Sequence, residues 1–269
     1  MIPNHLFDKY LKLLDLERSS PSYQMLCQII KTHLIRVPFE NISKLLYKKQ
    51  GLNYIPDLHT YLDGIKKNKF GGTCYANNYF LYLLLKDLGY EIKLCGVDMR
   101  HPDVHLISIV KIKNQEYIID GGYAAPFLNP LPIDLKEDYI INLGLEKYII
   151  KPKDDAGRTK VEQYYDGKLQ HWYVVNPQQR EIDEFRDVIK DSYSDAAVFM
   201  NAVRITRFSE NGSIVLKNLS LTENINNESS TVKITLKEMP FIIQKKFGIP
   251  SAIVYEALGH FKELRDIYD

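Results

Sequence analysis

The sequence predicts an α+β protein, because the spacing of its apolar residues changes along the chain. Residues 1 to about 90 repeat apolar side chains every three or four positions, which is the helical period. From about 90 to 220 the repeat shortens to two, as is typical of strands. With 45% hydrophobic and 26% charged residues, the composition is that of a globular protein with a substantial core.

The first third is expected to form several helices. The segment NHLFDKYLKLLDL near the N-terminus has the helical period, and Ser20-Pro21 resembles an N-cap followed by the proline favoured in a first turn. Pro38 disfavours helix at Val37 and should end that second helix. Residues 76–88 give the clearest helix, and Gly89 is the expected C-terminal cap.

The middle of the chain is expected to form strands joined by tight turns. Asp166-Gly167 and Asn211-Gly212 are typical hairpin turns. Residues 183–203 and 236–250 are each expected to be helical, the last helix being stopped by Gly248 and Pro250. The expected strands are 91–97, 104–112, 116–120, one on each side of the turn within 160–175, and 213–221.

Charge and cysteine content exclude several classes of function. A formal net charge of +1 provides no general field for nucleic acid or acidic membranes, and the cluster Lys66, Lys67 and Lys69 fits a solvated helix end. Three irregularly spaced cysteines fit neither a disulfide framework nor a zinc site. No signal peptide or membrane-spanning apolar run is visible, so a soluble cytoplasmic protein is expected.

Cys74 stands out from the other cysteines. It lies just after Gly71-Gly72 and just before the clearest helix. If that helix begins at Cys74, the thiol is expected over the unpaired N–H groups at the positive end of the helix. That position favours the thiolate, which is the nucleophilic form. A buried, inert cysteine is the alternative, and it suits Cys27 and Cys95, which lie in apolar runs.

A nucleophilic cysteine needs a histidine partner, which in turn needs a group to orient it. If residues 113 and 114 form the turn after the strand that begins at His105, that residue opposes Gly122, and Asp120 is its diagonal neighbour on the same face. Each residue alone has an ordinary alternative: a strand histidine and a turn aspartate. His101 competes, but it lies in an irregular loop.

The same residues resemble the motifs of the arylamine N-acetyltransferases. The resemblance covers nearly the whole chain, with the motifs in order. It rests on Pro-Phe-Glu-Asn at 38–41, on Gly71, Gly72, Cys74 and Asn78, on the strand 105–110, on Asp-Gly-Gly-Tyr-Ala at 120–124, on Pro130-Leu131, and on the terminal KKFGIP.

The resemblance implies a fold and a division into domains. It implies a helical bundle at 1–88, an antiparallel β-barrel-like domain at 89–185 and an α/β lid at 186–269, around a core shared with papain-like cysteine enzymes. It also implies that Cys74, His105 and Asp120 form a catalytic triad.

Two positions depart from the family motifs. The family usually has arginine before Gly-Gly and glutamate two residues after the cysteine, where this chain has Phe70 and Ala76. Glu40 would therefore lose its usual basic partner. Because a buried unpaired carboxylate is costly, we expect Lys69, another base or solvent to compensate.

The implied activity is acetyl transfer from acetyl-CoA to a small arylamine or hydrazine, through an acyl-cysteine and without metal. Tyr75, Tyr123 and Phe127 are candidates for a flat acceptor wall, with ordinary aromatic core as the alternative. Two other classes stay open. A cysteine hydrolase or transglutaminase-like enzyme would use the same triad, and an impaired homologue would act as an interaction protein.

Overall fold

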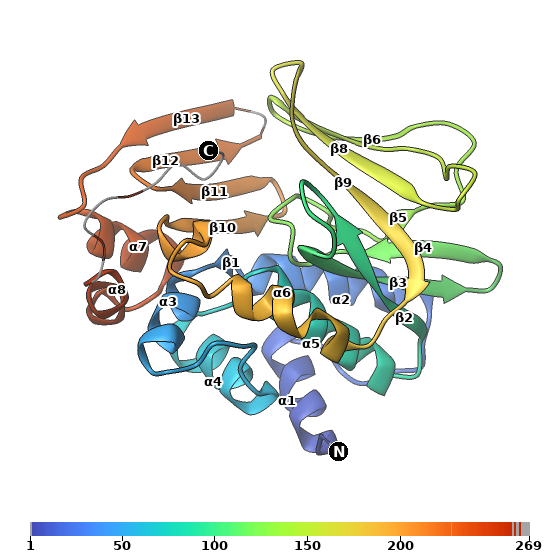
Figure 1. Ribbon diagram of the computed structural model, residues 1–269, viewed down its shortest axis with the longest axis horizontal. Helices are drawn as coiled ribbons and strands as arrows, with labels where there is room; N and C mark the ends of the chain where they lie inside the picture. The colour runs from blue at the N-terminus through green and yellow to red at the C-terminus, as the bar shows by residue number, and fades with distance from the viewer. Residues whose placement is uncertain (1, 227, 260, 262–263, 265–269) are drawn as a thin grey trace.

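The computed structural model describes residues 2–226, 228–259, 261 and 264. The N-terminal third of the chain is helical, as the sequence predicts (Figure 1). These helices are α1 (Asn4–Leu14), α2 (Tyr23–Arg36), α3 (Ile42–Lys49), α4 (Leu58–Asn68) and α5 (Cys74–Asp87). No helix in the described ranges is both long enough and apolar enough to cross a membrane.

The ends of these helices follow local chemistry. As predicted, α2 ends before Pro38, and Gly89 takes a positive φ of 89° after α5. The expected start at Ser20-Pro21 is wrong, because α2 begins at Tyr23 and is capped by Ser22. The Ser22 hydroxyl accepts a hydrogen bond from the Met25 N–H at 3.1 Å, which makes it the better cap.

The middle of the chain forms an eight-stranded antiparallel sheet, here called the barrel-like sheet, in the order β5-β4-β3-β2-β9-β8-β7-β6. The expected turn at Asp166-Gly167 is confirmed, with φ of 48° and 72°. The strands are β2 (Glu91–Asp98), β3 (His105–Ile112), β4 (Gln115–Ile119), β5 (Leu131–Pro132), β6 (Tyr139–Leu143), β7 (Glu146–Ile150), β8 (Thr159–Tyr165) and β9 (Lys168–Gln179).

A second sheet, here called the lid sheet, has the order β1-β10-β11-β12-β13. Helices α7 (Met239–Phe247) and α8 (Ser251–Leu258) follow its last strand, and α8 was not expected. Pro250, interpreted as a stop, instead stands at the N-cap of α8. The strands are β1 (Phe39–Glu40), β10 (Arg204–Ser209), β11 (Gly212–Lys217), β12 (Ser220–Ile225) and β13 (Glu228–Lys233).

Two further expectations need correction in this half. Residues 213–221 are not one strand, since Lys217 pairs with Ser220 around a turn in which Asn218 has a φ of 49°. The predicted hairpin at Asn211-Gly212 exists, but its turn lies one residue earlier because Ser209 pairs with Gly212.

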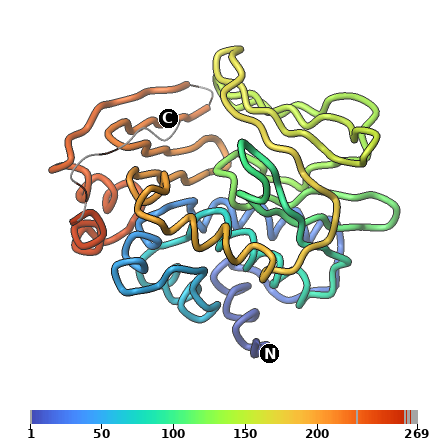
Figure 2. The backbone as a smooth tube through the Cα atoms, viewed as in Figure 1, coloured from blue at the N-terminus to red at the C-terminus, as the bar shows by residue number. Residues whose placement is uncertain are grey.

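The segment that joins the two sheets was expected to be one helix over 183–203. It is instead broken into short pieces, which Figure 2 shows as a winding connection across the front of the molecule. The pieces are η1 (Ile182–Phe185), α6 (Arg186–Asp191) and η2 (Val198–Met200). Side chains tie this segment to α3: the Lys44 ammonium donates to the Ser192 hydroxyl at 2.7 Å, and Lys48 pairs with Asp195.

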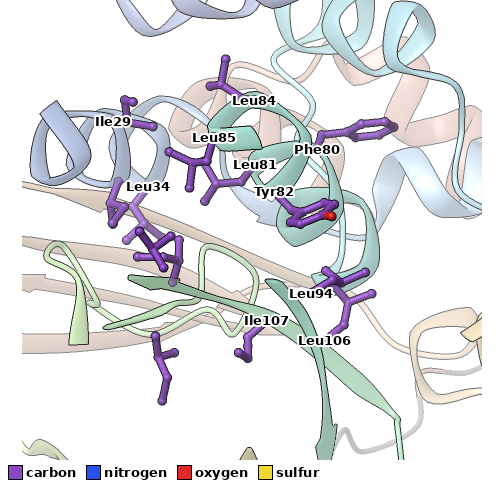
Figure 3. Close-up of a cluster of buried hydrophobic side chains, with 14 of the residues drawn as sticks. Ile29, Leu34, Phe80, Leu81, Tyr82, Leu84, Leu85, Leu94, Leu106 and Ile107 are labelled. Carbon is purple, nitrogen blue, oxygen red and sulfur yellow. The ribbon is translucent and has the colours of Figure 1, made fainter. Parts of the chain in front are cut away.

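Two hydrophobic cores hold the fold together. The larger joins the helices to the barrel-like sheet. In Figure 3 the α5 side chains Leu81 and Leu85 lie between α2 and the strands that carry Leu94 and Leu106. The smaller core packs α3, α7 and α8 against the lid sheet. The fold is therefore an α+β arrangement of a helical bundle, a barrel-like sheet and an α/β lid, while the boundaries after residues 88 and 185 stay predictions.

Candidate active site

Cys74 is the first residue of α5, as the sequence predicts, and its side chain is partly exposed. The loop before it is held close to β1, where Phe39 bridges to Gly72 and the Glu40 N–H donates to the Gly72 carbonyl at 3.1 Å. A Cβ on Gly71 would lie 1.9 Å from the Pro38 carbonyl oxygen. Gly71 therefore has to be glycine for the loop to approach β1 this closely.

His105 and Asp120 meet as the predicted register requires. Strands β3 and β4 pair Ser108 with Ile119 around a turn at residues 113 and 114, so His105 starts one strand and Asp120 follows the other. The His105 Nε2 lies 2.9 Å from the Asp120 Oδ2, and both side chains are buried. Because Nε2 faces Asp120, Nδ1 is the nitrogen left for the hydrogen bond with Cys74.

The charges at this contact favour a protonated imidazole. Burial lowers the pKa of His105, but the charge of Asp120, its hydrogen bond, and the interaction with Cys74 outweigh burial and raise this pKa to about 10. At neutral pH the ring is therefore an imidazolium held between a carboxylate and the Cys74 sulfur. This arrangement can donate one proton and take it back next to a nucleophile.

Asp120 is itself fixed by neighbours whose roles the sequence did not reveal. The Asn78 amide, one helical turn after Cys74, donates to Asp120 Oδ1 at 2.9 Å, and the Tyr173 hydroxyl donates to Oδ2 at 3.1 Å. Asn78 also accepts from the Gly121 N–H at 2.7 Å. The spacing of four residues after Cys74 was a usable signal for Asn78, whereas Tyr173 reaches the site from β9, a strand far away in sequence.

The three expected substrate-wall aromatics lie in different surroundings. Tyr123 is half-buried, its ring centroid is 5.9 Å from that of His105, and its hydroxyl pairs with His171 Nδ1 at 2.7 Å. Phe127 is buried and stacks behind Tyr123 at 6.0 Å. Tyr75 is buried and donates to the Asp103 carbonyl at 3.3 Å. Tyr123 is thus the ring placed next to His105, with Phe127 supporting it.

Glu40 is fully buried, and the expectation that a basic residue compensates its charge is wrong. Its carboxylate accepts hydrogen bonds from the Ser43 N–H and hydroxyl and from the Gly71 N–H. Burial raises the pKa of Glu40, although these donors oppose the shift. No ion pair joins Glu40 to a base in the described ranges. Phe70, where the family motif has arginine, packs into the smaller core against Tyr47.

Lys44 brings a buried cation close to the thiol, which sequence reasoning missed. Its ammonium lies 4.3 Å from the centroid of the Tyr193 ring and bonds Ser192. Burial lowers the pKa of Lys44 to about 8, although the nearby Cys74 opposes the shift. An alternating apolar and basic run such as SKLLYKK reads as an ordinary solvated helix face, so only the packing of the 192–193 segment reveals this position.

The other candidates lie apart from this arrangement. His101 is exposed in the loop before β3, and Cys95 is fully buried. Among the residues that the structure describes, no group of three or more His, Cys, Asp or Glu side chains could hold a metal ion.

Comparison with known proteins places this geometry in a family. The family model described as N-acetyltransferase matches residues 22–253. The arylamine N-acetyltransferase pineal gland isozyme of Gallus gallus is 26% identical over 193 residues, which is 62% of this chain and 64% of that protein. The chain thus matches less than two thirds of the length of this relative.

Solved structures share the fold. The arylamine N-acetyltransferase of Mycobacterium abscessus has a TM-score of 0.79 at 16% identity, covering 94% of this chain and 95% of that one. The enzyme of Bacillus cereus, described as having a unique Cys-His-Glu catalytic triad, has a TM-score of 0.73 at 21% identity, covering 91% and 98%. Because the family model matches residues 22–253, which is most of the 269 residues, the chain belongs to the arylamine N-acetyltransferase family.

Proposed function

We propose that this protein transfers an acetyl group from acetyl-CoA to a small arylamine or arylhydrazine, with Cys74 as nucleophile, His105 as acid and base, and Asp120 as the group that orients His105. The observation that carries the proposal is the buried contact of His105 with Asp120 at 2.9 Å, next to Cys74 at the start of α5, against which Gly122 packs closely. Family membership and the triad described for the Bacillus cereus enzyme support it.

The first half-reaction loads the enzyme. The Cys74 thiolate, paired with the His105 imidazolium, attacks the thioester carbonyl carbon. Backbone N–H groups at the start of α5, including that of Cys74, stabilise the oxyanion. The bond to the coenzyme A sulfur then breaks, His105 gives its Nδ1 proton to that sulfur, and coenzyme A leaves as a thiol.

In the second half-reaction the acetyl group passes from Cys74 to the acceptor. The amine nitrogen of the acceptor attacks the acyl-cysteine carbonyl while neutral His105 accepts one of its protons. The carbon–sulfur bond breaks, and Cys74 leaves as a thiolate beside the restored imidazolium. Asp120 keeps Nε2 protonated and stabilises the imidazolium throughout. Arylamines suit this step because they are weakly basic and largely unprotonated at neutral pH.

The acceptor is expected to lie against Tyr123, which is the exposed face of a stack backed by Phe127. Tyr75 is proposed as a second, more buried part of that wall. The expectations of a cytoplasmic location and of no nucleic-acid partner stay predictions.

Initial-rate kinetics with acetyl-CoA and an arylamine such as aniline test the proposal. We expect parallel lines in double-reciprocal plots, and activity lost in Cys74→Ala and in His105→Gln. Thioester consumption that does not depend on the amine would indicate the cysteine hydrolase instead. No turnover of thioesters, amides or activated esters would leave the interaction protein as the remaining candidate.

A further inference from the structure

Asn77 is a buried amide that takes no part in the steps described above. It lies in α5, three residues after Cys74, and is fully buried. Its Nδ2 group donates to the Gly72 carbonyl at 3.1 Å and to the Pro38 carbonyl at 3.4 Å, and its Oδ1 accepts from the Tyr61 hydroxyl at 3.0 Å. Because carbonyl oxygens can only accept, a single orientation of the amide satisfies all three partners.

These bonds tie the loop before Cys74 to the helix that Cys74 begins. Two other hydrogen bonds hold the same loop to Glu40, one from the Glu40 N–H to the Gly72 carbonyl at 3.1 Å and one from the Gly71 N–H to the carboxylate at 3.2 Å. Glu40 lies in β1, at the edge of the lid sheet. The Asn77 amide therefore supplies the tie from α5 itself.

The loop comes this close to α5 because Ala76 is small. A Cβ on Gly72 would lie only 2.9 Å from the Cβ of Ala76, so this part of the loop packs directly on the helix. The family motif has charged residues at two positions here, where this chain has Phe70 in the smaller core and Ala76. In this chain, neutral hydrogen bonds from Asn77 act where the loop meets the helix.

The Asn77 amide is backed by a layer of buried aromatic side chains. The Tyr61 ring packs edge-on against Tyr10 with centroids 6.0 Å apart, and the Tyr10 hydroxyl shares a hydrogen bond of 2.9 Å with His33 Nδ1. A Cβ on Gly121 would lie 3.0 Å from the His33 ring. The layer therefore reaches from the loop before the nucleophile to the loop that carries the carboxylate of the triad.

We propose that Asn77, oriented by Tyr61, is a positioning residue that sets the place of the Cys74 sulfur relative to His105. The inference rests on the proposed function for the reaction that it affects. Because a buried network with every member satisfied favours one geometry, the amide holds the loop in one conformation. A shift of that loop moves the first residue of α5, and a displacement of about 1 Å at a reacting group can cost about 10²-fold in rate.

Single-turnover acylation by acetyl-CoA measures this effect. Asn77→Leu keeps the approximate size of the side chain and removes all three hydrogen bonds, so the acylation rate should fall about 10²-fold. The half-saturating concentration of acetyl-CoA should stay unchanged, because a fully buried amide does not contact the donor. Tyr61→Phe should lower the rate about 3- to 10-fold, the effect of one hydrogen bond.

Tyr79→Phe is the matched control. It also removes one tyrosine hydroxyl, from α5 itself, and this hydroxyl makes no hydrogen bond within the described part of the chain. Both the acylation rate and the half-saturating concentration should match those of the wild-type protein.

A double variant separates positioning from general damage to the fold. If Tyr61 acts through Asn77, the variant with both Asn77→Leu and Tyr61→Phe should be acylated no more slowly than Asn77→Leu alone. Independent damage would instead multiply the two losses. Thermal unfolding of each variant shows that the rates belong to folded protein, and Tyr61→Phe, which removes a single oxygen atom, carries the test if Asn77→Leu does not fold.

Alkylation of Cys74 by iodoacetamide, followed by peptide mass spectrometry, tests the inference without an acetyl donor. Asn77→Leu should react about tenfold more slowly than the wild-type protein at pH 7 and equally fast at pH 10, where any cysteine is largely thiolate. Wild-type rates of alkylation and acylation in the folded variants, or losses that multiply in the double variant, would overturn the inference. A wild-type protein that is alkylated quickly but never acetylated would overturn the proposed function alone, and slower alkylation of the variants would then still support the role of Asn77.

Discussion

Gly122 is the position where the smallest possible change should disturb the site most. A Cβ built there would lie 2.7 Å from the Cys74 Cα and 2.8 Å from the Asn78 amide nitrogen, whereas ordinary contacts begin at 3.4 Å. Gly122→Ala must therefore separate the Asp120 loop from the start of α5 by about 0.7 Å, since the obstacle is backbone. A displacement of about 1 Å at a reacting group can cost about 10²-fold in rate.

We expect Gly122→Ala to lower kcat for acetyl transfer about 10²-fold and to destabilise the fold by about 1–3 kcal/mol, the usual cost of overpacking. Stopped-flow acylation and thermal unfolding measure the two effects. Gly259→Ala is the matched control, because its Cβ would meet nothing closer than 3.5 Å. An active Gly122→Ala variant with unchanged stability would refute the close packing of Gly122 on Cys74.

Three further perturbations follow from the same contacts. Asp120→Asn should lower kcat about 10²- to 10⁴-fold in steady-state assays, because an amide cannot stabilise the His105 imidazolium; an unchanged kcat would contradict this role. Burial lowers the pKa of His33 from 6.5 to about 3, so between pH 6.5 and pH 3 the unfolded chain binds more protons than the folded chain. The free energy of unfolding should therefore fall by about 2–3 kcal/mol between pH 6.5 and 4.5. Denaturant titrations should show a smaller fall in His33→Phe, and an equal fall would exclude His33 as the cause. Asn41→Ala removes two hydrogen bonds to carbonyls of the 199–204 segment and one from an N–H of that segment. This should lower the free energy of unfolding by about 2–4 kcal/mol and make the segment sensitive to limited proteolysis. A variant as resistant to the protease as the wild-type protein would contradict the role of Asn41 in holding the segment.

Local rules predicted much of the fold. Pro38 ended α2, Gly89 and Gly248 followed the ends of α5 and α7, and Asp166-Gly167 formed its hairpin. The same kind of reasoning found His105 beside Asp120, because the register of a two-residue hairpin follows from its turn alone.

Features that depend on distant contacts could not be predicted this way. β1 is a two-residue strand that depends on pairing with the distant β10 on one side and with Gly72 on the other. Tyr173 reaches Asp120 because β9 pairs with β2, a sheet order that no local pattern encodes. The burial of Lys44 depends likewise on the segment that packs over α3. Within the part of the chain that the structure describes, N–H and hydroxyl donors rather than a base hold the Glu40 carboxylate, which the resemblance to a motif could not reveal.

Intact-protein mass spectrometry after brief incubation with acetyl-CoA tests the central claim most directly. The account predicts one acetyl adduct on the wild-type protein, none on Cys74→Ala, and loss of the adduct when an arylamine is added. An adduct that persists in Cys74→Ala, or no adduct on a wild-type protein that remains folded, would contradict the assignment of Cys74 as the nucleophile that carries the acetyl group.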